Sequence, residues 1–96
     1  MKLKKYEVYF ILKPSLSEDD IRGFIEKFKQ QLTENNGMFA EEPKFEKRRL
    51  EYPIKKEVSG YYLLVKYDSP SNFNNILKAE MKYDKDILRY MFLSCR

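Results

Sequence analysis

Apolar residues recur along the chain in two patterns, and together these patterns predict four strands and two helices. Residues 6–12 and 61–67 are apolar at almost every position, which is typical of strands covered on both faces in the middle of a sheet. Residues 38–51 and 87–93 form two further strand-like segments. Pro43 interrupts the first of these, so we expect an edge strand or a bulge there.

Between the strands, apolar residues recur every three or four positions, as they do on one face of a helix. The first stripe consists of Ile21, Phe24, Ile25, Phe28 and Leu32, and the second of Phe73, Ile76, Leu77 and Met81. Ser15 to Glu18 and Ser17 to Asp20 both fit or approximate the spacing of a capping box at a helix start, and Asn36-Gly37 supplies a left-handed stop. We expect both stripes to face the core.

The order of elements, β-α-β-β-α-β, predicts an α+β fold, the ferredoxin-like split sandwich. If both crossovers are right-handed, both helices lie on one face of a four-stranded antiparallel sheet in the order 4-1-3-2. The other face is left to solvent or to a partner. Pro53 ends the second strand, and residues 55–60 are predicted to form a loop. The length allows one domain over residues 1–96.

Composition excludes most kinds of catalytic and metal site. The chain of 96 residues has no histidine and one cysteine, so it lacks the commonest general base and cannot form an internal disulfide. The three glycines are far apart, which excludes a glycine-rich phosphate loop. We expect no enzyme activity, no cofactor, no secretory signal, no membrane span and no redox role for Cys95.

The segment 45–56 is the most informative for function, because consecutive cations lead into an aromatic residue and a proline. Alternation along a strand places Arg48, Leu50 and Tyr52 on one face and Lys47, Arg49 and Glu51 on the other. An arginine beside a tyrosine can bind phosphate while the ring stacks on a base. The same charges can also serve only to protect an edge strand from unwanted pairing.

Residues 48–54, Arg-Arg-Leu-Glu-Tyr-Pro-Ile, closely resemble the Arg-Lys/Arg-Leu-Ala-Tyr-Pro-Ile signature of the bacterial-type small-subunit ribosomal protein S6 family. Further landmarks match in order along essentially the whole chain: Tyr6-Glu7, Asn36-Gly37, Gly60-Tyr61-Tyr62 and Ile87-Leu88-Arg89-Tyr90-Met91. The chain departs from the family pattern at Glu46, where the family usually has glycine, and at Glu51, where it usually has alanine. These two acids weaken the local attraction for RNA or favour a basic protein partner.

The resemblance implies a structural, non-enzymatic component of the small ribosomal subunit, in the cytoplasm or in an organelle. It implies binding to the central domain (platform) of the small-subunit ribosomal RNA, as a heterodimer with ribosomal protein S18 and without a small-molecule substrate. Carried over by position, the candidate contact residues are Lys4, Lys5, Tyr6, Arg48, Tyr52, Lys56 and Arg89. Charge and proximity add Lys2, Arg49 and Lys55.

The net charge of only +4 indicates a small RNA footprint, so we expect a second surface to bind a partner protein. The exposed sheet face and the edge strands are suited to this role. The alternative is a ferredoxin-like ligand-sensing or dimerisation module without a role in RNA binding. Such a module would pair through a sheet edge and bind a small anion near Arg48-Arg49.

Overall fold

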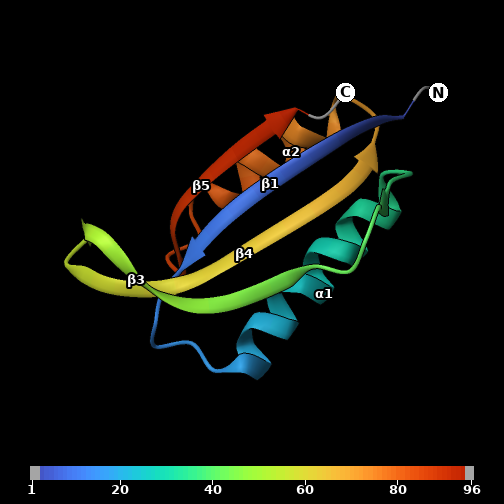
Figure 1. Cartoon of the computed structure of the whole chain (residues 1–96). Coiled ribbons are helices and arrows are strands. Elements are labelled where there is room, and N and C mark those ends of the chain that lie inside the picture. Colours follow the sequence, from blue (N-terminus) through green and yellow to red (C-terminus); the bar gives the residue numbers. More distant parts are fainter. Residues whose placement is uncertain (1–2, 95–96) are drawn as a thin grey trace.

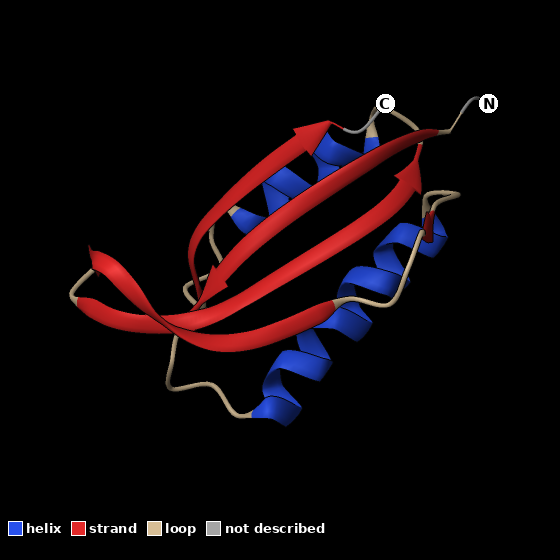
Figure 2. Cartoon of the chain, viewed as in Figure 1, coloured by secondary structure: helices blue, strands red, loops and turns tan. Residues whose placement is uncertain are grey.

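The computed structural model describes residues 3–94, so Lys2 and Cys95 lie outside the described residues. The elements are β1 (Lys4–Leu12), α1 (Glu18–Glu34), β2 (Met38–Phe39), β3 (Lys44–Ile54), β4 (Glu57–Ser69), α2 (Phe73–Met81) and β5 (Ile87–Ser94). Figures 1 and 2 show both helices on the same side of one sheet. Within residues 3–94, neither helix has the length and apolar character needed to cross a membrane.

The sheet has the predicted antiparallel order. β4 and β1 are its central strands, β5 pairs with β1, and both β2 and β3 pair with β4. The predicted second strand, residues 38–51, is therefore two strands on one edge of β4, separated by a stretch that contains Pro43. This arrangement confirms the ferredoxin-like prediction and leaves one face of the sheet, called here the open face, without a helix.

Local sequence signals set the ends of α1 as predicted. The Ser17 amide donates to the Asp20 carboxylate over 3.0 Å, and the Asp20 amide donates to the Ser17 hydroxyl over 3.1 Å, which makes a capping box. These hydrogen bonds lower the pKa of Asp20. At the other end Asn36 adopts a left-handed conformation, and the Gly37 amide closes the last turn on the Leu32 carbonyl.

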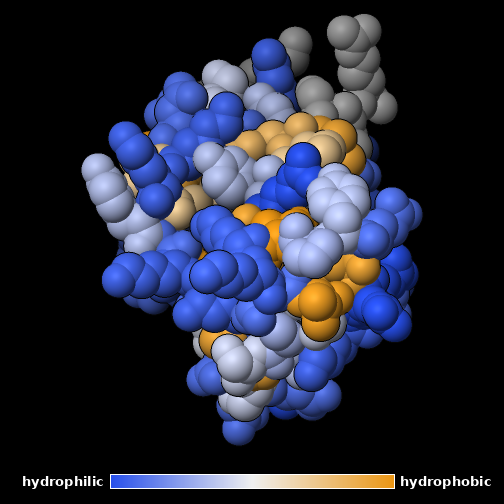
Figure 3. All heavy atoms as spheres, turned by 90° about the vertical axis from the view of Figure 1, so that its left-hand side faces the viewer, coloured by the Kyte–Doolittle hydropathy of each residue, from blue (hydrophilic) through white to orange (hydrophobic). Residues whose placement is uncertain are grey.

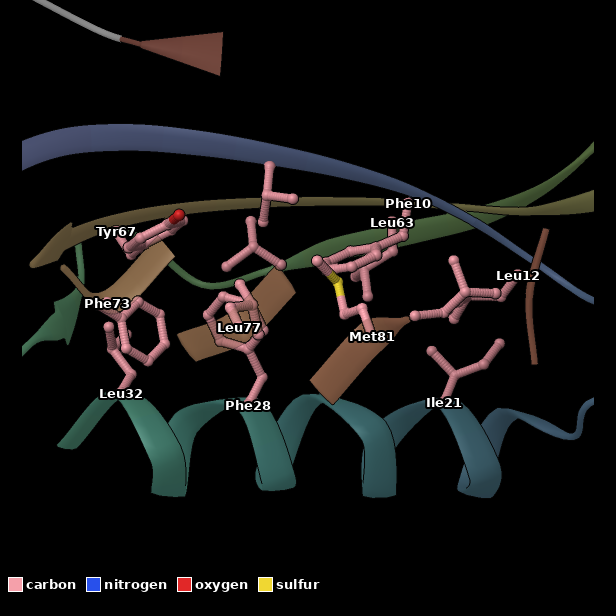
Figure 4. Close-up of a cluster of buried hydrophobic side chains, with 13 residues drawn as sticks. Phe10, Leu12, Ile21, Phe28, Leu32, Leu63, Tyr67, Phe73, Leu77 and Met81 are labelled. Atoms are coloured by element: carbon pink, nitrogen blue, oxygen red, sulfur yellow. The ribbon is translucent and has the colours of Figure 1, made fainter. Parts of the chain in front are cut away.

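The main core lies between the helices and the sheet (Figure 4). Side chains from β1 and β4, among them Phe10 and Tyr67, face Phe28 of α1 and Phe73 of α2, and these rings meet in edge-to-face pairs. The prediction for the second helical stripe was wrong at Ile76, which is 37% exposed. The nine residues of α2 are too few for a broad buried stripe, and only Phe73, Leu77 and Met81 are buried.

The predicted loop over residues 55–60 is also wrong. β3 continues through Pro53 to Ile54, β4 begins at Glu57, and these two end residues pair. Lys55 and Lys56, with φ of 49° and 69°, form a two-residue turn. Positive φ at both turn positions gives the twist that suits a tight hairpin, but such turns usually carry asparagine or glycine, so the lysine pair gave no recognisable signal.

A second, smaller apolar cluster forms on the open face. Ile11 of β1, Leu50 of β3 and Leu88 of β5 are its buried members, with Tyr9, Ile54 and Tyr62 packed against it. The regular pairing of β3 with β4 is interrupted between Arg49 and Ile54, and the pairing of β1 with β5 shifts between Ile11 and Leu12. Burial of Leu50 therefore holds the part of the hairpin where the strand ladder is irregular.

Gly60 permits the close approach of β4 to β1 beside this cluster. A Cβ atom at this position would lie 2.9 Å from Cγ2 of Ile11 and 2.9 Å from the backbone oxygen of Leu12. We predict that Gly60→Ala lowers the free energy of unfolding by about 1–3 kcal/mol, because the backbone of β1 must move to make room. Chemical denaturation measures this change.

The matched control is Gly23→Ala in the middle of α1, where nothing lies within 4 Å of the added Cβ atom. Alanine there raises the free energy of unfolding by about 0.5–1 kcal/mol, because it restricts the unfolded chain and favours helix. Equal effects of the two substitutions would contradict the close packing at Gly60.

Candidate functional site

Three of the sequence-predicted residues, two from β3 and one from β5, come together on the open face. Tyr52 lies on β3 and Arg89 on β5, the strands at opposite edges of the sheet, yet Nη1 of Arg89 donates to the Tyr52 hydroxyl over 3.4 Å. Arg48 lines the same cavity as both. Residues 37 positions apart in the sequence therefore meet on the open face, beside the apolar cluster of Ile11, Leu50 and Leu88.

Arg48 is held in a defined position by two neighbours. Its guanidinium carbon lies 5.3 Å from the centroid of the Tyr62 ring, and the same group forms an ion pair with Glu46. Tyr62 meets Tyr9 edge to face at 5.4 Å, and burial, with a smaller contribution from Tyr62, raises the pKa of Tyr9. Glu46 thus offsets part of the positive charge of Arg48. The Tyr62 ring, which packs on Tyr9, holds the guanidinium group in place.

Three further predicted cations lie on the same hairpin. Lys55 and Lys56 form the exposed turn of the hairpin, and exposed Arg49 also lines the cavity. Figure 3, which views the left-hand side of Figure 1, shows a mainly hydrophilic surface with small apolar areas between the polar side chains. The hairpin end therefore presents several cations around an apolar and aromatic centre.

The predicted residues near the chain start do not join this group. Lys4 and Lys5 pair with Ser69 and Asp68 at the end of β1 far from the hairpin, and a strand of this length spans roughly 30 Å. Tyr6 is half-buried and packs on Tyr67, with 5.8 Å between ring centroids. Its ring contributes to the core edge, so it is a poorer stacking surface than Tyr52. Lys2 lies outside the described residues.

Sequence reasoning missed the aromatic pair under Arg48. Tyr9 and Tyr62 both lie on the open face, because Val8 and Leu63, their neighbours in sequence, face the helices. The available signal was that two central strands are apolar on both faces while helices cover only one. Aromatic residues on the uncovered face are therefore candidates for a binding surface.

An apolar row crosses the middle of the open face. Tyr9 pairs in register with Leu64 on one side and with Met91 on the other, and Met91 is 51% exposed. Leu93, also on β5, is 43% exposed. Beside this row, Lys66 forms ion pairs with Glu7 and Glu41, so the central part of the face is apolar and locally charge-balanced.

The geometry of the site is suited to binding. Among residues 3–94, no three His, Cys, Asp or Glu side chains are grouped so that they could hold a metal ion. Arginine guanidiniums around exposed rings can bind phosphate and stack on bases, and the apolar row can pack against a protein.

Comparison with known proteins gives a consistent result over nearly the whole chain. The family model described as "Ribosomal protein S6" matches residues 5–94. The chain is 36% identical over 91 residues to the small ribosomal subunit protein bS6 of Thermoanaerobacter pseudethanolicus, covering 95% of this chain and 96% of that protein. It is 32% identical, with the same coverage, to the protein of that name from Caldanaerobacter subterraneus subsp. tengcongensis.

A solved structure has the same fold. The crystal structure of 30S ribosomal protein S6 from Thermotoga maritima superposes with a TM-score of 0.87 at 22% sequence identity. The superposition covers 98% of this chain and 89% of that one. The chain is therefore similar to S6 proteins in the arrangement of its helices and strands as well as in its sequence.

Two substitutions two positions apart on β3 separate packing from binding. We predict that Leu50→Ala lowers the free energy of unfolding by about 2–5 kcal/mol, because Leu50 is only 7% exposed. Arg48→Ala changes it by less than about 1 kcal/mol, because its ion pair with Glu46 is exposed to solvent. Thermal and chemical unfolding measure both, and a larger loss for Arg48→Ala would contradict this division.

Proposed function

The chain belongs to the ribosomal protein S6 family and is a structural, non-enzymatic protein of the small ribosomal subunit; from this premise we propose that it binds the platform of the small-subunit RNA together with ribosomal protein S18. The observation that carries the RNA part is the meeting of Arg48, Tyr52 and Arg89 at the hairpin end. Guanidinium groups bind phosphates, and an exposed ring offers a face to an unpaired base.

The charge of the hairpin end supports a small RNA contact. Lys55 and Lys56 add two exposed cations to the arginines, but Glu46 is paired with Arg48, and Glu51 lines the cavity. Each phosphate contact to single-stranded RNA contributes roughly 0.7 to the salt dependence of the affinity. A few such contacts, opposed by nearby acids, give modest affinity, so a second surface is needed for stable assembly.

The open face is the proposed surface for S18. Met91 and Leu93 expose apolar side chains without a helix to cover them, and half-buried Tyr9 and Leu64 continue the row across the face. Apolar contact with a partner protein is favourable because it removes this area from water. We propose that Lys4 and Lys5, at the far end of β1, form a separate and weaker contact.

The ligand-sensing or dimerisation alternative lacks support. The family model covers residues 5–94, which includes the edge strands and Arg48-Arg49, the features that such a module would use for pairing and anion binding. No contact among the described residues favours a small anion over an RNA phosphate at Arg48 and Arg49. We therefore retain the ribosomal proposal alone.

A binding assay with a fragment of platform RNA tests the proposal. We predict sub-micromolar binding in physiological salt only when S18 is present. The variant Arg48→Ala/Arg49→Ala/Lys55→Ala/Lys56→Ala should bind more weakly and lower the salt slope by up to about 3, because it loses up to four phosphate contacts. The control Lys27→Ala/Lys29→Ala removes two exposed cations from α1 and should bind as the wild type does.

Two outcomes would contradict the proposal in different ways. Tight binding by the isolated chain would exclude the need for S18. Equal effects of the hairpin variant and the α1 variant would exclude the hairpin as the RNA contact.

A further inference from the structure

The cavity beneath the hairpin has an apolar floor. Ile11 and Leu50, each 7% exposed, line it together with partly buried Ile54 and Tyr62. Residues of this kind bind water poorly, so a flat apolar group that covers the floor gains from leaving solvent. We call this feature the hairpin cavity.

The rim of the hairpin cavity combines one exposed ring with guanidinium groups. The Tyr52 ring is 60% exposed, and its hydroxyl accepts the hydrogen bond from Arg89. Arg48 and Arg49 also line the cavity. Three positive groups around an exposed ring suit a ligand that has both a planar face and an anionic group.

Two acids limit how much negative charge the hairpin cavity accepts. Glu46 forms an ion pair with the guanidinium group of Arg48, and Glu51 lines the cavity. Of the three arginines, Arg49 and Arg89 therefore carry most of the attraction for an anion. This balance suits a single phosphate group rather than the continuous double row of phosphates on an RNA duplex.

We propose that the hairpin cavity takes one unpaired nucleotide of RNA, with its base against Tyr52 over the apolar floor and its phosphate near Arg89 and Arg49. The bases of a paired RNA helix are stacked and inaccessible, whereas bulged and loop nucleotides can be splayed out onto aromatic side chains. The inference deepens the proposed RNA-binding function, since it names the kind of RNA element that the hairpin reads.

Titration of the full chain with adenosine 5′-monophosphate, followed by NMR, tests the hairpin cavity without S18 or a ribosome. We expect shifts of the backbone amides of Leu50, Tyr52 and Arg89, and an affinity about tenfold above that for adenosine or inorganic phosphate alone. Tyr52→Leu should weaken nucleotide binding about tenfold, whereas Tyr52→Phe should retain it, because base stacking needs the ring.

Tyr83→Leu is the matched control. Tyr83 is 80% exposed and has the Lys82 ammonium 5.7 Å from its ring centroid, so it offers a ring beside a cation outside the cavity. This variant should bind the nucleotide as the wild type does. Equal losses in Tyr52→Leu and Tyr83→Leu, or shifts scattered over α1, would overturn the assignment. Far-ultraviolet circular dichroism and melting confirm that each variant is folded.

A second arm of the experiment distinguishes RNA from a free nucleotide. Two short RNA hairpins differ only in that one carries a single bulged adenosine and the other is fully paired. We expect the bulged hairpin to bind about tenfold more tightly and to lose this preference with Tyr52→Leu. Nucleotide binding without discrimination between the hairpins would overturn the assignment to RNA.

The outcomes also separate this inference from the proposed function. If the nucleotide fails to bind at the cavity while the platform RNA still binds with S18, only the inference fails. If the platform RNA does not bind but the bulged RNA hairpin is preferred, the proposed contact between the β3–β4 hairpin and the platform fails. The inference about an unpaired nucleotide then stands.

Discussion

The packing of Leu50 with Ile11 and Leu88 on the open face is the contact on which the polar site depends. Between Arg49 and Ile54 the pairing of β3 with β4 is irregular, so backbone hydrogen bonds alone do not fix this part of the hairpin. Burial of Leu50 places its neighbours at the end of the sheet, where Tyr52 reaches Arg89 on the opposite edge strand. Gly60 makes this arrangement possible, because a side chain there would meet β1.

This arrangement explains how the chain can act as a structural protein of the ribosome. The helix-covered core supplies stability, and the open face is left for contacts. Charge and aromatic rings concentrate at the hairpin end, while apolar side chains cross the middle of the face. Glu46 and Glu51 lower the net positive charge at the hairpin end, which is why we propose that two proteins bind the RNA jointly rather than this chain alone.

The sequence predicted what depends on local signals and periodicity. The capping box at Ser17, the stop at Asn36 and the order of the strands follow from short motifs and from the handedness of crossovers. The tight turn at Lys55 and Lys56, the exposure of Ile76 and the second apolar cluster were not predicted. The turn and the cluster depend on the twist of the hairpin and on shifts in strand register, which involve residues far apart in the sequence. The exposure of Ile76 follows from the shortness of α2.

Within the site, alternation along β3 grouped Arg48, Leu50 and Tyr52, which share the hairpin cavity, but it placed Arg49 and Glu51 on the other face although both line the same cavity. It also could not show that Leu50 is buried and that Arg48 is paired with Glu46. A double-mutant cycle of Leu50→Ala and Leu88→Ala tests most directly whether the hairpin is held against the rest of the sheet. The account predicts a coupling energy of about 0.5–3 kcal/mol in the free energy of unfolding, because both side chains share one cluster. Additive effects, within about 0.3 kcal/mol, would contradict it.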